Sequence, residues 1–420
     1  MLVLTSTAVI AAVSLLIPLV LRLCRLPIPD IVGLIVAGIV IGPQVLGWAE
    51  LDPPVQVLAL IGLGFLLLLA GLEIDLGQLR GAVLARTVTG FALSFGIAVA
   101  VGFGLSLGGL VRSPLLIAVT LSATSLGIVL PILEDAGQAD TSLGRVVIAG
   151  ASVAEVAPIL LLSVLFSASD GGIVAPMVLL AAFLVLVAAV AAVIAGIERT
   201  RRLTRTLLAL QHTTAEIRVR GVVALLMIFA ALATRFGLEA ILGAFLAGAT
   251  VNALDRDESA THGLLRVKLR AIAFGVFVPV FFVSTGMSID VGALTHPETL
   301  VRVPVFVTAL LLVRGAPVIV YRRWARRRRQ LVAAGFLQAT SLSIPVVAGA
   351  IGVRLGLMSA STYAALVAAG LLSVLLFPVL AVRLLAGPTS VTGQHLPRPA
   401  TPEIPHIVDK ATPTHLGELE

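Results

Sequence analysis

The chain has few of the residues on which disulfide-linked, metal-binding and water-soluble domains depend. Its single cysteine, Cys24, excludes a disulfide framework and a cysteine metal site. Charged residues make up 12% of the 420 residues and aromatic residues 5%, and the six histidines show no metal-ligand spacing. We therefore expect no metal centre and no cofactor, and the low charge excludes an ordinary soluble fold.

Apolar residues predominate along the chain. Hydrophobic residues make up 59% of the chain, and the mean hydropathy is +1.11. Nearly charge-free stretches of about 17–25 residues recur along the chain, which is the length that a helix needs to cross a bilayer. The sequence predicts an all-α polytopic membrane protein with about 13 transmembrane helices.

The basic residues predict the orientation of these helices. With the N-terminus outside, most of the 29 Lys and Arg residues fall in segments that face the cytoplasm, as the positive-inside rule requires. The run YRRWARRRRQ (321–330) is then a cytoplasmic loop and not a nucleic-acid site. The C-terminus is cytoplasmic, in a multi-pass protein of the cell membrane. Only two of the basic residues are lysine, which favours a bacterial, GC-rich genome.

Three pairs of similar segments predict that the two halves of the chain are copies. They are ATSLGI (123–128) with ATSLSI (339–344), AGLEIDLGQL (70–79) with TGMSIDVGAL (285–294), and IVGLIVAGIVIG (31–42) with ILGAFLAGATVN (241–252). The members of each pair lie an odd number of predicted spans apart, so the copies cross the membrane in opposite directions. Such inverted-topology repeats are typical of secondary transporters, which bind their substrate between the repeats.

The repeats also give the predicted domain boundaries. Residues 1–385 form one transmembrane domain, with repeat one at about 1–167 and repeat two at about 218–385. Residues 386–420 are polar and rich in Pro and Thr, which predicts a disordered cytoplasmic tail. We expect no attached nucleotide-binding regulatory domain.

The repeated hexamer predicts two broken helices. Ser and Thr in a membrane helix usually bond back to the preceding turn. Here, however, each copy is followed by a proline, Pro131 or Pro345, which frees the carbonyl four residues earlier. Breaks of this kind are tolerated at membrane depth where neighbouring groups satisfy the backbone. We predict that the two broken helices cross, and that they offer ion-binding groups from Thr124, Ser125, Thr340 and Ser341.

Glu155 is the predicted proton- and cation-binding carboxylate. It lies well inside an apolar span, where a carboxylate costs several kcal/mol and usually marks an ion or proton pathway. Ser152 lies one turn earlier, and Pro158 frees the Ala154 carbonyl beside it. A carboxylate in a dehydrated site can hold either a proton or a monovalent cation, which is the chemistry of antiport.

Arg314 is the second charge predicted at membrane depth. It needs compensation, either from an acidic partner, with Glu155 as the first candidate, or from the carbonyl ends of the broken helices. No predicted span contains a histidine or a second carboxylate facing Glu155, so the sequence does not favour an enzyme such as an intramembrane hydrolase. Two other functions stay open: a sodium-coupled organic-anion symporter of similar fold, and a channel or sensor without exchange.

Over residues 5–385 the chain resembles the cation:proton antiporter superfamily, in its Kef-type and sodium–proton exchanger branch. The resemblance is carried by GFLLLLAGLEIDLGQL, SATSLGIVLPILEDAG, GASVAEVAPILLL, LGAFLAGATVNALD, PVFFVSTGMSIDVGAL and LLVRGAPV. It implies a sodium/proton-antiporter-like fold, a homodimer, and exchange of Na+ or K+ for H+ by elevator-like alternating access.

The resemblance also assigns roles to three residues. The family carries Asp-Asp or Asn-Asp where this chain has Ala154 and Glu155, so the second carboxylate is kept and the first polar group is lost. This loss favours one-for-one exchange. Arg314 matches the family's basic residue in the corresponding span.

Overall fold

The computed structural model describes residues 2–24, 29–73, 81–166, 174–198, 216–254, 260–292, 297–325 and 327–386. All regular elements in these ranges are helical, which confirms the predicted all-α fold. The predicted tail from residue 387 onward, the arginine-rich segment 199–215 and the repeat residues 74–79 lie outside the described residues.

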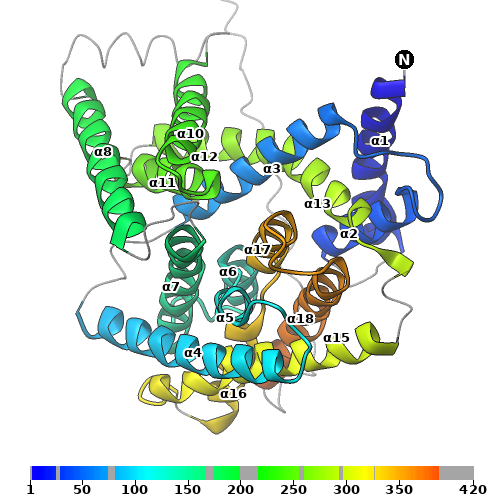
Figure 1. The fold of residues 1–420 in the computed structure, drawn as a ribbon. Helices are drawn as coiled ribbons and strands as arrows, with labels where there is room; N and C mark the ends of the chain where they lie inside the picture. Colours follow the sequence, from blue (N-terminus) through cyan, green and yellow to red (C-terminus); the bar gives the residue numbers. More distant parts are fainter. Residues whose placement is uncertain are drawn as a thin grey trace, which may run out of the picture. The chain divides into compact units, whose positions relative to one another are not determined.

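The helices are shown in Figure 1. In chain order they are α1 (Leu2–Leu23), α2 (Asp30–Ile41), α3 (Pro53–Leu72), α4 (Gly81–Leu107), α5 (Pro114–Leu121), α6 (Leu126–Asp135), α7 (Ser142–Leu165), α8 (Val174–Glu198), α10 (Ile217–Arg235), α11 (Ala240–Leu254), α12 (Ala260–Ile272), the π-helical turn η1 (Ala273–Phe277), α13 (Val278–Met287), α15 (Pro297–Leu310), the π-helical turn η2 (Leu311–Gly315), the 3-10 turn η3 (Ala316–Tyr321), α16 (Arg328–Ala339), α17 (Ser343–Arg354) and α18 (Ala360–Ala386).

Among the described residues, eleven helical segments are long and apolar enough to cross a membrane. Two of these segments are interrupted, α5 with α6 and α16 with α17. The shorter apolar helices α2 and α11 have 12 and 15 residues. The structure is therefore that of a polytopic membrane protein, and the total of about thirteen spans stays a prediction.

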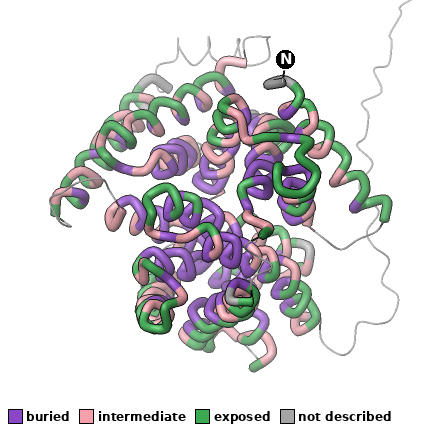
Figure 2. Tube along the Cα trace, turned by 45° about the vertical axis from the view of Figure 1, so that its right-hand side comes forward, coloured by how far each residue is buried: buried purple, intermediate pink, exposed green. Residues whose placement is uncertain are grey.

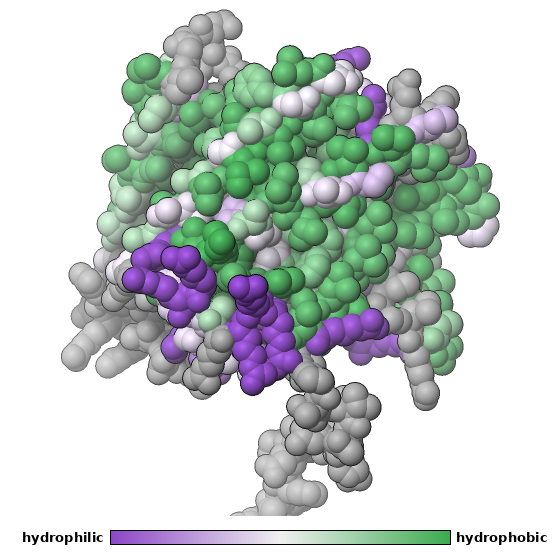
Figure 3. All heavy atoms as spheres, turned by 90° about the horizontal axis from the view of Figure 1, so that it is seen from below, coloured by the Kyte–Doolittle hydropathy of each residue, from purple (hydrophilic) through white to green (hydrophobic). Residues whose placement is uncertain are grey.

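Exposed apolar side chains mark the surface that contacts lipid. Figure 2 shows the buried residues gathered inside the helix assembly, with exposed stretches on its outer helices. Leu15 of α1 is 73% exposed and Leu107 at the end of α4 is 91% exposed. Figure 3 shows a face on which hydrophobic residues predominate, with most of the hydrophilic residues toward its lower edge. Such a surface is stable in lipid and would be unfavourable in water.

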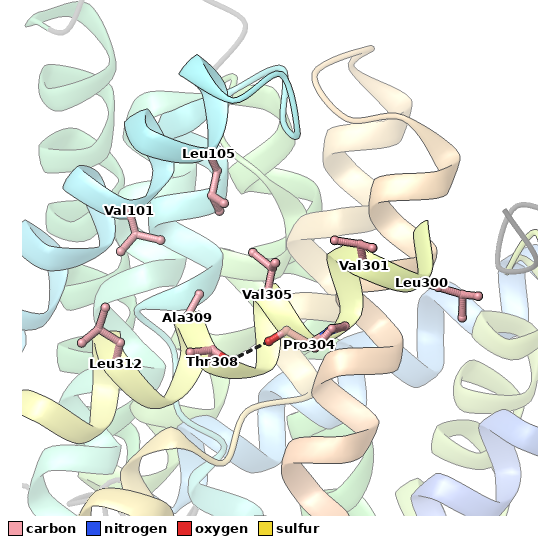
Figure 4. Close-up of a pocket in the computed structure, with 9 residues that line it drawn as sticks. All are labelled: Val101, Leu105, Leu300, Val301, Pro304, Val305, Thr308, Ala309 and Leu312. Carbon is pink, nitrogen blue, oxygen red and sulfur yellow. Dashed lines mark hydrogen bonds between the residues drawn. The ribbon is translucent and has the colours of Figure 1, made fainter. Parts of the chain in front are cut away.

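An apolar groove of about 580 Å³ lies between α4 and α15 (Figure 4). Val101 and Leu105 line it from α4, and Val305 and Ala309 line it from α15. The one hydroxyl in the groove, on Thr308, donates to the Pro304 carbonyl of its own helix at 2.8 Å. The groove therefore offers lipid a surface with little unmet hydrogen-bonding capacity.

Helix contacts divide the described spans into two groups. The first group contains α1–α3 and α10–α13, whose members pack against one another. The second contains α4–α7 and the segments from α15 to α17. α18 joins it through the Ser373 bond to Ser341 and the contact of Phe377 with Phe336 of α16, and α7 also contacts α11 of the first group. α8 contacts α7 of the second group and α11 of the first. The interrupted helices both belong to the second group, in the lower part of Figure 1.

Reciprocal glycine contacts hold the first group together. A Cβ added at Gly38 of α2 would lie 2.1 Å from the Val283 carbonyl oxygen of α13, and one at Gly286 of α13 would lie 2.1 Å from the Ile35 carbonyl oxygen of α2. The pair α3 and α11 repeats this arrangement through Gly71 and Gly248, at 2.2 and 2.0 Å from facing carbonyl oxygens. Small residues let membrane helices approach closely, so the repeated sequence segments produce two matching helix contacts.

We expect Gly286→Ala to separate α13 from α2 and to destabilise the protein by about 1–3 kcal/mol, because the facing backbone has no room for the methyl group. Thermal unfolding of the detergent-solubilised protein measures the effect. The control is Gly104→Ala on α4, where an added Cβ meets nothing within 4 Å. Equal unfolding temperatures for the two variants would contradict the close contact.

Candidate functional site

The two helix breaks coincide with the two copies of the hexamer. α5 ends at Leu121 and α6 begins at Leu126, while α16 ends at Ala339 and α17 begins at Ser343. The breaks bond directly to each other, because the Ser125 backbone N–H donates to the Thr340 carbonyl at 3.0 Å. The hydroxyl oxygen of Ser125 also accepts from the backbone N–H groups of Leu342 and Ser343, at 3.0 and 3.3 Å. Ser125 thus satisfies donors at the start of α17, as a helix cap does.

Carbonyl groups that have no donor within their own helix link the breaks to neighbouring helices. Pro158 has no N–H for the Ala154 carbonyl of α7, and that carbonyl accepts instead from the backbone N–H of Thr124 at 3.2 Å. At the second break, the Ser341 carbonyl precedes α17 and accepts no helical N–H, and the hydroxyl of Ser373 on α18 donates to it at 3.1 Å. Each break is therefore linked to a neighbouring helix through a backbone carbonyl that has no donor within its own helix.

Arg314 bonds to neutral groups from both broken helices. It is 3% exposed and lies on the π-helical turn η2. Its Nε donates to Thr124 Oγ1 at 2.8 Å, and its Nη2 donates to Gln338 Oε1. The first-choice partner from the sequence, Glu155, is not among these bonds, so that prediction was wrong. The structure agrees better with the alternative, in which the carbonyl end of a broken helix compensates the charge of Arg314. Thr124 Oγ1, which accepts from Arg314, donates in turn to the Gln338 carbonyl near the end of α16.

Gln338 connects three helices and was not identified from the sequence. Its side-chain oxygen accepts from Arg314, and its Nε2 donates to the Val147 carbonyl of α7 at 2.7 Å. It is 1% exposed. A glutamine immediately before the second hexamer was a usable signal, since a buried amide at membrane depth needs partners for its donors and acceptors.

Glu155 lies on α7, beside the start of α6. Its side chain is 6% exposed, and the backbone N–H of Leu126, the first residue of α6, donates to its carboxylate. The positive end of a helix dipole favours a negative charge there. The other oxygen, Oε2, is buried without a hydrogen-bond partner among the described residues. One carboxylate oxygen is thus anchored and the other is left open.

The remaining predicted ligands differ in whether their hydroxyl groups already have a hydrogen-bond partner. The Ser341 hydroxyl is fully buried and has no partner among the described residues. Ser152 and Thr340 donate to the carbonyls of Ile148 and Phe336 on their own helices, both at 3.0 Å. These two residues follow the ordinary back-bonding pattern and retain only their oxygen lone pairs. Pro131 lies inside α6, after the break.

Glu73 is a second carboxylate near the site that the sequence reading missed. It follows the last residue of α3, and its Oε1 accepts from Arg270 of α12 at 2.7 Å. Its other oxygen lies 3.7 Å from the place that a Cβ of Gly127 in α6 would occupy, and its charge acts on Glu155. Burial raises the pKa of Glu73, while the hydrogen bond and charge of Arg270 lower it. Its repeat counterpart is Ser288, so the repeat gave no signal for a carboxylate.

We expect Gln338→Leu to destabilise the protein by about 1.5–3 kcal/mol, because the buried Arg314 loses a hydrogen-bond acceptor and the Val147 carbonyl loses its donor. Thermal unfolding in detergent is the measurement. Gln56→Leu is the control, since Gln56 is exposed and bonds only the nearby Leu51 carbonyl among the bonds of the described residues. A Gln338→Leu variant as stable as this control would show that the network is not needed for folding.

Comparison with known proteins agrees with this architecture. Residues 10–386 match the family of transmembrane sodium/hydrogen exchangers. YjbQ of Bacillus subtilis is 28% identical over 393 residues, which cover 89% of this chain and 62% of YjbQ. The chain therefore spans less than two thirds of that relative. The Na+/H+-K+ antiporter GerN of Bacillus cereus is 30% identical over 63% of this chain and 66% of GerN.

A solved structure shows the same fold. The sodium proton antiporter MjNhaP1 of Methanocaldococcus jannaschii superposes with a TM-score of 0.63 at 18% identity, over 92% of this chain and all of MjNhaP1. The match to the family covers nearly all of the described helices. This chain is a multi-pass membrane protein that belongs to the sodium/hydrogen exchanger family.

Proposed function

We propose that the protein exchanges a monovalent cation, Na+ or K+, for H+ across the cell membrane, with Glu155 as the carboxylate that both ions share. The observation that carries this proposal is the open carboxylate oxygen of Glu155, buried beside two helix breaks at membrane depth. A buried carboxylate without a partner binds a positive ligand or takes up a proton, because an uncompensated charge there is costly. Exchange follows when the two ligands exclude each other.

The surroundings of Glu155 support a cation as the second ligand. Its oxygen Oε2 is buried and unpartnered among the described residues, as is the hydroxyl of Ser341 in the second break, and oxygen atoms are the ligands that alkali cations use. Arg314 keeps its own partners and does not occupy the carboxylate. A cation therefore does not have to displace an arginine from Glu155. The names of the relatives include both Na+ and K+, so either ion is a candidate.

Charge counting favours one-for-one exchange. Glu155 and Arg314 lie at the breaks, and Ala154 provides no second titrating group beside Glu155. The nearby Glu73 forms an ion pair with Arg270, which offsets its charge. A site that is neutral when Glu155 is ionised gains one charge from either a cation or a proton. Each half-cycle then carries the same charge across the membrane in opposite directions, and the exchange is electroneutral.

Alternating access requires the site to face each side of the membrane in turn. We infer an elevator-like movement of the second helix group, which holds the breaks, against the first. A cavity of about 490 Å³ between the groups supports this movement: α3 and α13 contribute Leu63, Ser284 and Thr285, and α17 and α18 contribute Val346, Ala350 and Tyr363. A boundary that contains a cavity is less tightly packed than the glycine contacts inside the first group. The first group is the proposed dimer-forming half of a homodimer.

The orientation belongs to the same proposal. The exposed residues Arg322, Arg323 and Arg327 lie between η3 and α16, and the exposed Arg328 begins α16. The positive-inside rule puts this end of the helices in the cytoplasm, with the N-terminus outside and the C-terminus inside.

We expect Glu155→Gln to abolish cation-driven proton release from proteoliposomes, because an amide can neither release a proton nor hold a cation by charge. Proton flux is followed with a pH-sensitive dye after addition of Na+ or K+ salts. The control is Glu239→Gln, which removes a carboxylate from an exposed ion pair with Arg354. Flux in the Glu155→Gln variant equal to that of the wild type would refute the assigned role.

A second measurement tests the stoichiometry. In proteoliposomes whose membrane potential is clamped with K+ and valinomycin, Na+-driven proton release by the wild-type protein is expected to have the same rate at zero and at negative-inside potential. One-for-one exchange moves no net charge, so the potential does no work on it. A rate that changes with the potential in proportion to the imposed voltage would show an unequal ratio.

A further inference from the structure

The turn that carries Arg314 is irregular, and this irregularity leaves a backbone acceptor free. Arg314 lies on the π-helical turn η2, which passes directly into the 3-10 turn η3. Pro317 lies four residues after Val313 and has no N–H for the Val313 carbonyl. A carbonyl without a donor at membrane depth costs several kcal/mol unless another group satisfies it.

Ser94 of α4 provides that donor. Its hydroxyl donates to the Val313 carbonyl at 2.7 Å, and both Ser94 and Val313 are fully buried. Thr87 and Thr89 on the same helix behave differently, because their hydroxyls bond carbonyls of α4 itself. The contact from α4 to η2 is therefore a specific property of Ser94 and not the ordinary back-bonding of hydroxyls in membrane helices.

We propose that Ser94 is a positioning residue for Arg314: its bond to the neighbouring carbonyl fixes the π-helical turn, and so sets the place of the guanidinium beside the first helix break. This inference rests on the proposed function, since it gives the position of Arg314 a consequence for ion binding. Ser94 does not touch the ion. Ser94 fixes the turn, and the turn positions Arg314. The Nε of Arg314 then bonds Thr124 Oγ1, which lies 2.8 Å away.

The same device occurs elsewhere in the molecule. The hydroxyl of Ser373 donates to the Ser341 carbonyl, which the second break leaves without a helical donor, and this bond joins the break to α18. Ser94 satisfies the Val313 carbonyl in the turn of Arg314 as Ser373 satisfies the Ser341 carbonyl in the break. In both cases a serine on a neighbouring span fixes a backbone segment that carries part of the site.

Loss of the Ser94 bond to the turn should change the affinity for the cation more than the maximal rate of transport. Thr124 bonds both Arg314 and the Ala154 carbonyl next to Glu155, so a shift of the guanidinium changes the geometry of the break that faces the carboxylate. The expected result for Ser94→Ala is a rise of about three- to ten-fold in the apparent KM for the cation, the range set by one lost hydrogen bond, with Vmax changed by less than about two-fold.

The experiment uses the full-length protein in proteoliposomes, with proton release titrated against Na+ and K+ and normalised to the amount of reconstituted protein. Ser94→Thr keeps a hydroxyl and is expected to restore the wild-type KM. Thr87→Val is the matched control, because it removes a fully buried hydroxyl from the same helix that bonds only α4. An unchanged KM in Ser94→Ala, or an equal rise in Thr87→Val, would overturn the role of Ser94.

A double-mutant cycle separates positioning from general damage. Pro317→Ala restores an N–H that can bond the Val313 carbonyl, so Ser94→Ala should raise KM less in this background than in the wild type. The wild type, the two single variants and the double variant form the cycle. Their unfolding temperatures report the coupling between Ser94 and Pro317 even where a variant transports poorly. Equal effects of Ser94→Ala in both backgrounds would refute the mechanism. Absence of exchange by the wild type in every salt would refute the proposed function itself, which distinguishes the two failures.

Discussion

The structure depends on one constraint: backbone groups that leave the helical pattern at membrane depth must find partners in other helices. Three such acceptors are the carbonyls of Ala154, which Pro158 frees, of Ser341, which the second break frees, and of Val313, which Pro317 frees. A different span supplies a donor to each, from the Thr124 backbone, Ser373 and Ser94 respectively. Because an unmet carbonyl in this environment costs several kcal/mol, these bonds fix the irregular segments relative to their neighbours and make the breaks compatible with a stable fold.

The same arrangement decides where the two buried charges lie. Arg314 is satisfied by a hydroxyl and an amide, Thr124 and Gln338, while Glu155 faces the first N–H of α6. Had the two charges paired, the arginine would have occupied the carboxylate. Separate neutral partners keep both charges in the site and leave one carboxylate oxygen open. The open oxygen is thus a consequence of how the breaks are satisfied, and not of Glu155 alone.

The features of this structure that depend on local chemistry can be predicted from the sequence. The features that depend on contacts between distant segments cannot. Hydropathy gave the all-α membrane fold, and the glycines at 38, 71, 248 and 286 stood out because the repeat keeps them. The breaks fall at the repeated hexamers, where the backbone and the Ser125 hydroxyl bond across to the other break. The partner of Arg314 depended on which spans face each other, which no local pattern encodes. For the same reason no local pattern distinguishes Ser94 from Thr87 or Thr89, and Glu73 has no matching carboxylate in the repeat, which carries Ser288 there.

The two helix groups differ in how they are held together, and this difference bears on movement. In the first group, backbones touch at glycines, so α2 with α13 and α3 with α11 can shift only by losing close contact along their length. In the second, directional hydrogen bonds join α7, α18 and α4 to the breaks and to the turn of Arg314, and they would be lost together if these segments separated. Each group therefore resists internal change. The boundary between them contains both a cavity and a direct contact of α7 with α11, and the elevator-like movement proposed above would take place along it.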